Sequence, residues 1–187
     1  MNKRLIRLFT LIAGIFIVLL IFSSSLFVTI GSGEKGVKYQ PLAGGLDKDQ
    51  VYGQGLKFKM PWNSMIIFEV RKQENEQSME VLSSNGLDIG VDVSIRYRPS
   101  DQKIGYLYDD VGTNYLNKII IPELRSATRE VIGQYKPQEL YSSSREKIQN
   151  KIYERTRNVL EKNNIRLDAI LIRSIVLPDQ IKKAIER

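Results

Sequence analysis

The sequence predicts an α+β domain that follows an N-terminal membrane anchor. Strand patterns dominate up to Pro99, and helical patterns with one returning strand come after it, an order typical of α+β proteins. Ahead of both lies a run without any charged side chain, residues 8–33, which is long enough to span a bilayer. The chain shows no internal repeat and no low-complexity segment.

The uncharged run predicts a single transmembrane helix. A helix through residues 8–33 would be about 39 Å long, and the hydrocarbon core of a bilayer is roughly 30 Å thick. Lys3, Arg4 and Arg7 precede the run, and positive charges keep such a flank in the cytoplasm. We therefore expect residues 1–33 to form a cytoplasmic stub and an anchor, with the bulk of the chain outside the cytoplasm.

A cleaved signal peptide is the alternative interpretation of the same run. Its apolar region would be residues 8–22, and Ser23, Ser24 and Ser25 would supply the small residues of a cleavage site. The apolar run continues through residues 26–30, beyond that site, which favours the anchor. A product shortened by roughly 25 residues would identify a signal peptide.

Residues 34–99 are predicted to form a β-rich lobe close to the membrane. Residues 37–39, 65–71 and, more weakly, 76–82 have strand character, and residues 41–49 are predicted to be a loop. Glycines punctuate residues 52–62, where apolar residues alternate. An Asn-Gly turn over residues 83–86 predicts a hairpin, and the clean alternation of residues 89–97 predicts a half-buried strand.

Residues 100–178 are predicted to form an α/β lobe. Residues 101–108 form a short helix and residues 113–135 a longer one, which Pro122 kinks or divides. Ser143 and Glu146 have capping-box spacing ahead of a helix that carries Ile148, Ile152, Val159 and Leu160 and ends at Asn163-Asn164. Residues 165–177, apolar on both faces, predict a well-buried strand.

Pro178 is predicted to start a last helix, because proline favours the first helical turn. Residues 179–187 are then the beginning of a long helix, since the apolar stripe of Ile181, Ala184 and Ile185 continues to the end of the sequence. We expect the natural protein to continue beyond Arg187.

Composition excludes several kinds of chemistry. The chain has no cysteine and no histidine, so disulfides, thiolate nucleophiles, zinc-finger sites and histidine triads are impossible within it. The formal charge is +7, of which Lys3, Arg4 and Arg7 supply three charges and residues 100–187 the other four, whereas a nucleic-acid interface needs a dense basic patch. We expect no nucleic-acid partner.

The sequence also offers no convincing catalytic group. The pairs Asp109-Asp110 and Glu74 with Glu76 lie in polar segments, where solvated surface charge is the usual role. The serines at 142–144 fit helix capping better than a nucleophile. Gly53 and Gly55 fit a turn better than a phosphate loop. We expect no enzyme activity, no catalytic residue, no cofactor and no metal.

Four basic residues and one tryptophan are the candidate functional residues. Arg125 and Arg129 share a helix face and are expected to pair with carboxylates inside the domain or at a subunit contact. Lys151 and Arg155 lie on a basic helix face with Lys147 and Lys162, which either binds anionic lipid or is the solvated side of an amphipathic helix. Trp62 is expected either at the lipid interface or in the core of a small sheet.

Taken together, the segments resemble the SPFH (band 7) superfamily of stomatins, prohibitins, flotillins and bacterial regulators of membrane proteases. The resemblance covers the whole chain and is carried by the order of many short segments. These are Gly36-Val37, GLKFKMPW at 55–62, SNGL at 84–87, IRYRP at 95–99, Pro122, RSATR at 125–129, ELYSS at 139–143 and ILIRSIVLP at 170–178. Among the branches of this superfamily, the prohibitins have the most similar sequence segments.

The resemblance implies a strongly bent antiparallel sheet with packed helices, leading into a long helix. It further implies a non-enzymatic scaffold of the inner membrane, periplasmic if the protein is bacterial. Such scaffolds assemble laterally into large rings or cages with copies or siblings, enclose a lipid and protein microdomain, and associate with AAA+ membrane proteases. We place the lateral contacts at Arg125, Arg129, Lys151 and Arg155. A monomeric, membrane-anchored module that binds a lipid or a soluble ligand is the alternative.

Overall fold

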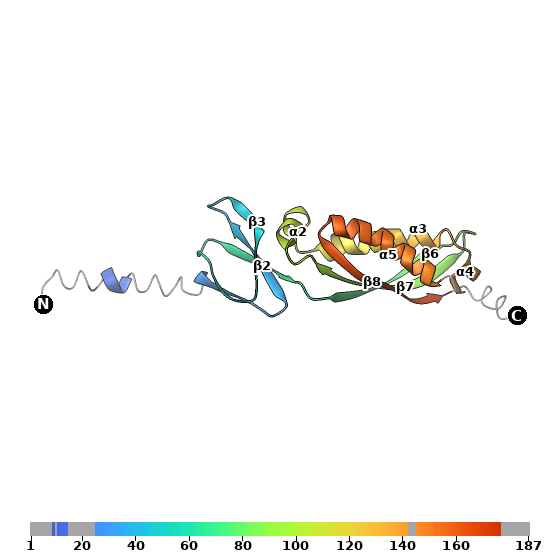
Figure 1. The fold of residues 1–187 in the computed structure, drawn as a ribbon, viewed down its shortest axis with the longest axis horizontal. Helices are drawn as coiled ribbons and strands as arrows, with labels where there is room; N and C mark the ends of the chain where they lie inside the picture. The colour runs from blue at the N-terminus through green and yellow to red at the C-terminus, as the bar shows by residue number, and fades with distance from the viewer. Residues whose placement is uncertain (1–8, 10, 15–24, 142–144, 177–187) are drawn as a thin grey trace.

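The computed structural model of the protein describes residues 9, 11–14, 25–141 and 145–176. Among these residues, no helix combines the length and the apolar character that crossing a bilayer requires. Most of the predicted anchor, Ser143 of the predicted capping box and the predicted last helix from Pro178 lie outside the described residues. The described elements form two groups that lie end to end along the long axis of the molecule (Figure 1).

The first group, which we call the β lobe, contains two small antiparallel sheets. Strand β1 (Phe27–Ile30) pairs with β4 (Gly55–Phe58), and β2 (Glu34–Gln40) lies between β3 (Gly45–Tyr52) and β5 (Ser64–Glu69).

Two sequence predictions are wrong in the β lobe. A continuous helix through residue 33 is excluded, because β1 occupies Phe27–Ile30 and its β-branched residues fit an extended ladder with β4. The predicted loop over residues 41–49 is shorter, because Gly44 and Gly45 adopt positive φ angles of 91° and 79° and turn the chain directly into β3.

The second group, which we call the helical lobe, is one sheet covered on one face. Its strands are β6 (Gln73–Leu82), β7 (Asp88–Pro99) and β8 (Ile165–Val176), and each pair is antiparallel. Helices α3 (Ile121–Ile132) and α5 (Arg145–Lys162) pack side by side over it, with the short α4 (Pro137–Tyr141) between them in sequence (Figure 1). The described strands therefore form three separate sheets rather than one strongly bent sheet.

Local sequence signals correctly predicted several features of the helical lobe. The hairpin turn is confirmed, with Gly86 at a φ of 79° and the Ser83 amide donating to the Leu87 carbonyl. The predicted interruption at Pro122 is also confirmed. A π-helical turn, η1 (Leu116–Ile120), runs directly into α3 just before this proline, which lacks the N–H that a continuous helix would use.

The alternation of β7 and the strand at β8 are both confirmed, whereas the predicted burial of both faces of β8 is wrong. Ile89, Val91, Val93, Ile95 and Tyr97 are buried against the helices. In β8 only one face is buried, and Arg166 and Arg173 are exposed. Two register shifts against β7 leave Asp168 and Arg173 as extra residues of β-bulges. The sequence prediction overlooked these polar positions because most residues of the segment are apolar.

A short helix, α2 (Ile104–Asp110), joins the two lobes by packing on β3. A Cβ atom on Gly105 would lie 2.4 Å from the carbonyl oxygen of Lys48, so only glycine permits this approach. Lys48 forms an ion pair with Asp109, and the Tyr106 hydroxyl donates to Asp49 at 2.6 Å. We call these contacts the α2–β3 seam, and they fix the β lobe against the helical lobe.

Replacement of Gly105 by alanine should destabilise the protein. Because the Lys48 backbone blocks the new methyl group, overpacking should cost about 1–3 kcal/mol of unfolding free energy, measured by denaturant titration of the detergent-solubilised chain. Gly53→Ala is the matched control, since a Cβ there meets no atom within 4 Å. Equal stability of the two variants would contradict the close packing at the seam.

Candidate functional site

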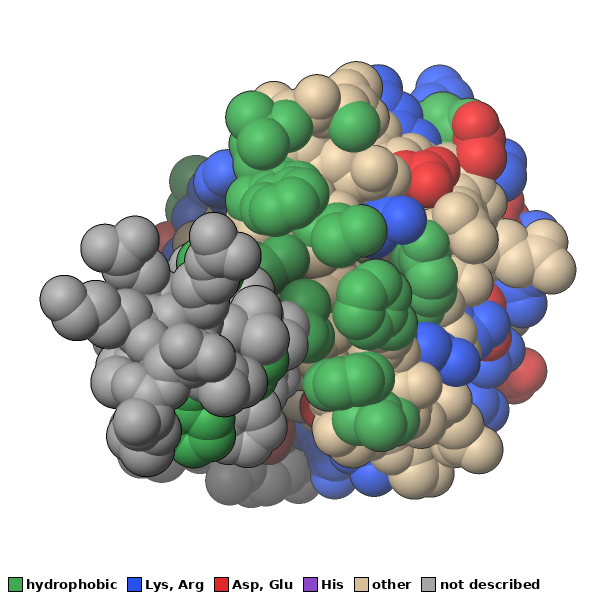
Figure 2. Space-filling view, turned by 90° about the vertical axis from the view of Figure 1, so that its left-hand side faces the viewer, with side chains coloured by type: hydrophobic (Ala, Val, Ile, Leu, Met, Phe, Trp, Pro, Cys, Tyr) green, Lys and Arg blue, Asp and Glu red, His purple; other side chains and the backbone are tan. Residues whose placement is uncertain are grey.

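Large hydrophobic side chains are exposed at the free end of the β lobe. Figure 2 views the molecule from this end and shows them gathered over much of its face. We define the apolar tip by five residues that are between 44% and 65% exposed: Phe27, Leu56, Phe58, Met60 and Trp62. Exposed apolar patches on soluble surfaces commonly mark contacts with proteins or membranes.

The β1–β4 ladder builds the apolar tip. Phe27 lies opposite Phe58 in the antiparallel register, so both side chains project from the same face. Their rings meet edge to face with centroids 5.8 Å apart. Leu56 lies two residues before Phe58 and shares its face. A turn follows β4, in which the Asn63 amide donates to the Met60 carbonyl at 2.9 Å.

Lys59 ties the apolar tip to the end of the uncharged N-terminal run. Its backbone amide donates to the Leu26 carbonyl at 2.8 Å. Its Nζ atom donates to the carbonyls of Ser25 at 2.8 Å and Asn63 at 3.1 Å. The uncharged run therefore enters the domain directly beside the apolar tip. Any membrane that held the run would lie next to these hydrophobic side chains.

Trp62 does not lie in a hydrophobic core, because the residue is 53% exposed. Of the two interpretations that the sequence left open, the core position does not match this exposure. The position at a lipid interface stays a prediction.

Arg125 and Arg129 project from α3, and neither takes part in an ion pair within the part of the chain that the structure describes. The Arg125 guanidinium donates to the neutral Gln77 side chain at 2.9 Å. Inside the described domain, the expected carboxylate partners of this pair are therefore missing. No described carboxylate therefore neutralises the charge of these two guanidinium groups.

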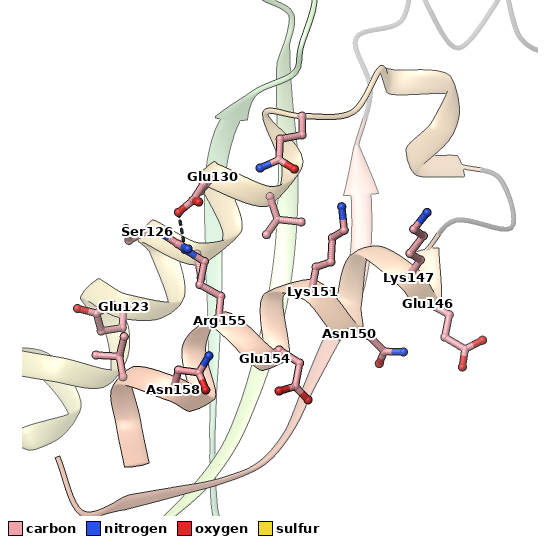
Figure 3. A pocket seen from close by; sticks show the side chains of 14 residues that line it. Glu123, Ser126, Glu130, Glu146, Lys147, Asn150, Lys151, Glu154, Arg155 and Asn158 are labelled. Carbon is pink, nitrogen blue, oxygen red and sulfur yellow. Dashed lines mark ion pairs between the residues drawn. The ribbon is translucent and has the colours of Figure 1, made fainter. Parts of the chain in front are cut away.

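Lys151 and Arg155, by contrast, are engaged within the helical lobe. Arg155 forms an ion pair with Glu130 at 2.5 Å, which links α5 to α3 (Figure 3). The Lys151 ammonium lies 5.1 Å from the centroid of the Tyr135 ring, a cation–π contact. Both side chains border an open groove of about 1050 Å³ between α3 and α5, which Glu123, Glu146, Lys147 and Glu154 also line.

Glu74 and Asp92 are held by hydrogen bonds that favour their ionised forms. Glu74 accepts hydrogen bonds from Arg96 at 2.9 Å and from Arg173 at 2.7 Å, and these bonds lower the pKa of its carboxyl. Hydrogen bonds from Ser174 and Ser78 lower the pKa of Asp92. Both groups therefore stay ionised at neutral pH, whereas a general acid needs a raised pKa.

One member of each acidic pair singled out in the sequence is engaged in ion pairs. Asp109 is held by Lys48 at the α2–β3 seam, and Glu74 is held by two arginines. Within the described ranges, no cluster of three or more residues of metal-binding type occurs. Sequence reasoning missed the Arg96–Glu74–Arg173 network. Alternation placed Arg96 on the polar face of β7, but Arg173 reaches that network only through the bulge in β8.

Comparison with known proteins places the chain in a family. The family model described as "SPFH domain / Band 7 family" matches residues 28–187. Prohibitin-7, mitochondrial, of Arabidopsis thaliana is 24% identical over 84% of this chain and 56% of its own length. Mitochondrial prohibitin complex protein 1 of Caenorhabditis elegans is 23% identical over 99% of this chain and 66% of its own length.

Prohibitin-1 of Saccharomyces cerevisiae is similar to the same degree, with 22% identity over 84% of this chain and 54% of its own length. The chain thus spans between 54% and 66% of the length of these three relatives. Because the family model covers most of the chain, from the second residue of β1 onward, this protein belongs to the SPFH (band 7) family and is similar to prohibitins.

Proposed function

We propose that the protein is a non-enzymatic membrane scaffold whose copies assemble side by side into a large ring or cage. The observation that carries this proposal is the apolar tip, which lies where the uncharged N-terminal run enters the domain. A surface of this kind fits the interfacial region of a bilayer, where aromatic side chains such as Trp62 are favoured.

The anchor in this proposal is shorter than the uncharged run. Strand β1 takes Phe27–Ile30, which leaves the 19 residues 8–26 for the membrane. A helix of that length would measure about 28 Å, close to the roughly 30 Å of the hydrocarbon core. Lys3, Arg4 and Arg7 would hold the N-terminus in the cytoplasm. Residues 27–187 would then form the extracytoplasmic part, with the β lobe nearer the bilayer than the helical lobe.

Lateral assembly follows from tethering and from unused charge. Tethering to one bilayer raises the effective concentration of neighbouring copies to about the mM range, and a head-to-tail contact whose rotation closes gives a ring. Arg125 and Arg129 are the contact residues that we favour, because the described ion pairs leave them out. Lys151 and Arg155 would support such a contact indirectly, by holding α5 against α3.

The enclosed membrane area would be the functional unit. One relative carries the name mitochondrial prohibitin complex protein 1, which describes a member of a complex. By analogy we propose that an assembly of this chain, alone or with a sibling of the same family, bounds a lipid microdomain and regulates a membrane-bound AAA+ protease.

A monomeric, membrane-anchored binding module is the second candidate. The open groove between α3 and α5, about 1050 Å³ in volume, favours it, because a groove of that size can accept a lipid headgroup or a soluble ligand. The two candidates differ in particle size, and this difference decides between them.

The protein extracted from native membranes in mild detergent should be a large assembly. Contacts among tethered copies should survive gentle extraction, so light scattering after gel filtration should give a mass many times the 21.5 kDa of one chain. Electron microscopy of the same fraction should show closed rings. A monodisperse single chain would contradict the scaffold and favour the binding module.

Reversal of both free arginines should reduce that assembly. In Arg125→Glu/Arg129→Glu, carboxylates would repel the acidic groups that we expect on the neighbouring copy, so the particle mass on native gels should fall at least several-fold. Lys103→Glu/Lys136→Glu is the matched control, since it changes the net charge equally at two exposed lysines that lie outside the helices and strands. Full-sized particles from the arginine variant would exclude this pair from the contact.

A further inference from the structure

The two edges of the β6–β7–β8 sheet differ in their protection. Side chains of α5 cover the outer edge of β8. Arg145 donates to the carbonyls of Ile172 at 2.5 Å and Arg173 at 3.0 Å, and the Gln149 side chain accepts from the Ile172 amide at 3.2 Å. The Tyr153 hydroxyl donates to the Leu167 carbonyl at 3.2 Å. Exposed edges bind foreign strands unless they are covered in this way.

Strand β6 forms the opposite edge and has no such cover. Its ten residues pair only with β7. In the described parts of the chain, the backbone of β6 forms no further hydrogen bond with another element. The side-chain amide of Gln77 donates to the carbonyl of its own neighbour, Glu76, at 3.0 Å. A long row of peptide groups is therefore free to pair with an added strand.

Charges of opposite sign flank this free edge. Glu76 and Glu80 are exposed on the face of the sheet that the helices leave open, and neither forms an ion pair with a described residue. Arg125 and Arg129 lie on the helix side. An open hollow of about 710 Å³ contains residues from both sides, including Ser78, Glu80, Arg125 and Arg129. The edge is thus acidic toward one face and basic toward the other.

From this arrangement we propose that the edge of β6 is a strand-addition site for an extended segment of a partner protein. Side chains of an added strand alternate between the two faces. The segment therefore carries Lys or Arg at every second position, toward Glu76 and Glu80, and Asp or Glu at the positions between, toward Arg125 and Arg129. Main-chain hydrogen bonds supply affinity and the alternating charges supply specificity.

Pairing of β6 with β6 of a second copy is disfavoured by the same charges. Glutamates of both strands would crowd one face of the joined sheet, and like charges on neighbouring strands are destabilising. The site therefore selects a partner other than itself. It goes beyond the scaffold proposed above, since it requires neither a ring nor a membrane.

The test uses the full chain in mild detergent and a fluorescent ten-residue peptide in which Lys and Glu alternate. The peptide should bind, measured by fluorescence anisotropy, and hydrogen exchange should slow at the amides of β6 but not at those of β8. Two control peptides should bind at least tenfold more weakly: one with five Lys followed by five Glu, and one with the alternating sequence N-methylated throughout. Equal binding of either control would overturn the proposal.

A variant with reversed charges at the edge of β6 provides a second test of the proposal. Glu76→Lys/Glu80→Lys should weaken binding of the alternating peptide at least tenfold, while hydrogen exchange of α5 and β8 stays unchanged and so reports an intact fold. Unchanged affinity would overturn the proposal. So would β6 protection that depends on protein concentration without peptide, because the occupant would then be a second copy. Particle mass, measured in parallel, tests the scaffold separately.

Discussion

The close approach of α2 to β3 is the constraint on which the rest of the structure depends. Gly105 lies against the Lys48 carbonyl without room for a side chain, and the Lys48–Asp109 ion pair and the Tyr106–Asp49 hydrogen bond hold the helix there. The Phe68 ring also meets Tyr108 and Tyr115 at centroid distances of 6.2 and 6.1 Å. These contacts join the lobes, so the orientation of the apolar tip sets the orientation of α3, α5 and the edge of β6.

The charged side chains divide into those that maintain this geometry and those that remain available. Arg155, Arg96 and Arg173 each hold a carboxylate of the same chain, and Arg145 covers a sheet edge. Arg125 and Arg129 form no ion pair with a described residue, and neither do Glu76 and Glu80 on the neighbouring strand β6. Exposed ion pairs contribute little to stability, so this contrast has little consequence for folding.

The sequence predicted what depends on local signals and failed where distant contacts decide. Alternation along residues 89–97, the Asn-Gly turn and the interruption at Pro122 are local, and the structure confirms them. Phe27–Ile30 continue an apolar run in the sequence, and only pairing with β4, nearly thirty residues later, makes them a strand. The bulges at Asp168 and Arg173 likewise arise from the register against β7.

The candidate residues follow the same rule. Helical spacing identified Arg125, Arg129, Lys151 and Arg155 as exposed cations, but only the packing of α3 on α5 separates the engaged pair from the free pair. The sequence could not decide whether Trp62 is buried or exposed, because a residue beside a small sheet can point either into its core or toward solvent. The apolar tip as a whole was missed, since Phe27 and Phe58 meet only across the ladder.

Trp62 gives the most direct test of the central claim, that the apolar tip faces a bilayer. It is the single tryptophan of the chain, so fluorescence of the full protein in lipid vesicles reports on this site alone. We expect the emission maximum to lie at a shorter wavelength than that of the unfolded chain in water. We also expect lipids brominated near the headgroup to quench the emission strongly. Emission typical of water and unaffected by brominated lipids would contradict the account.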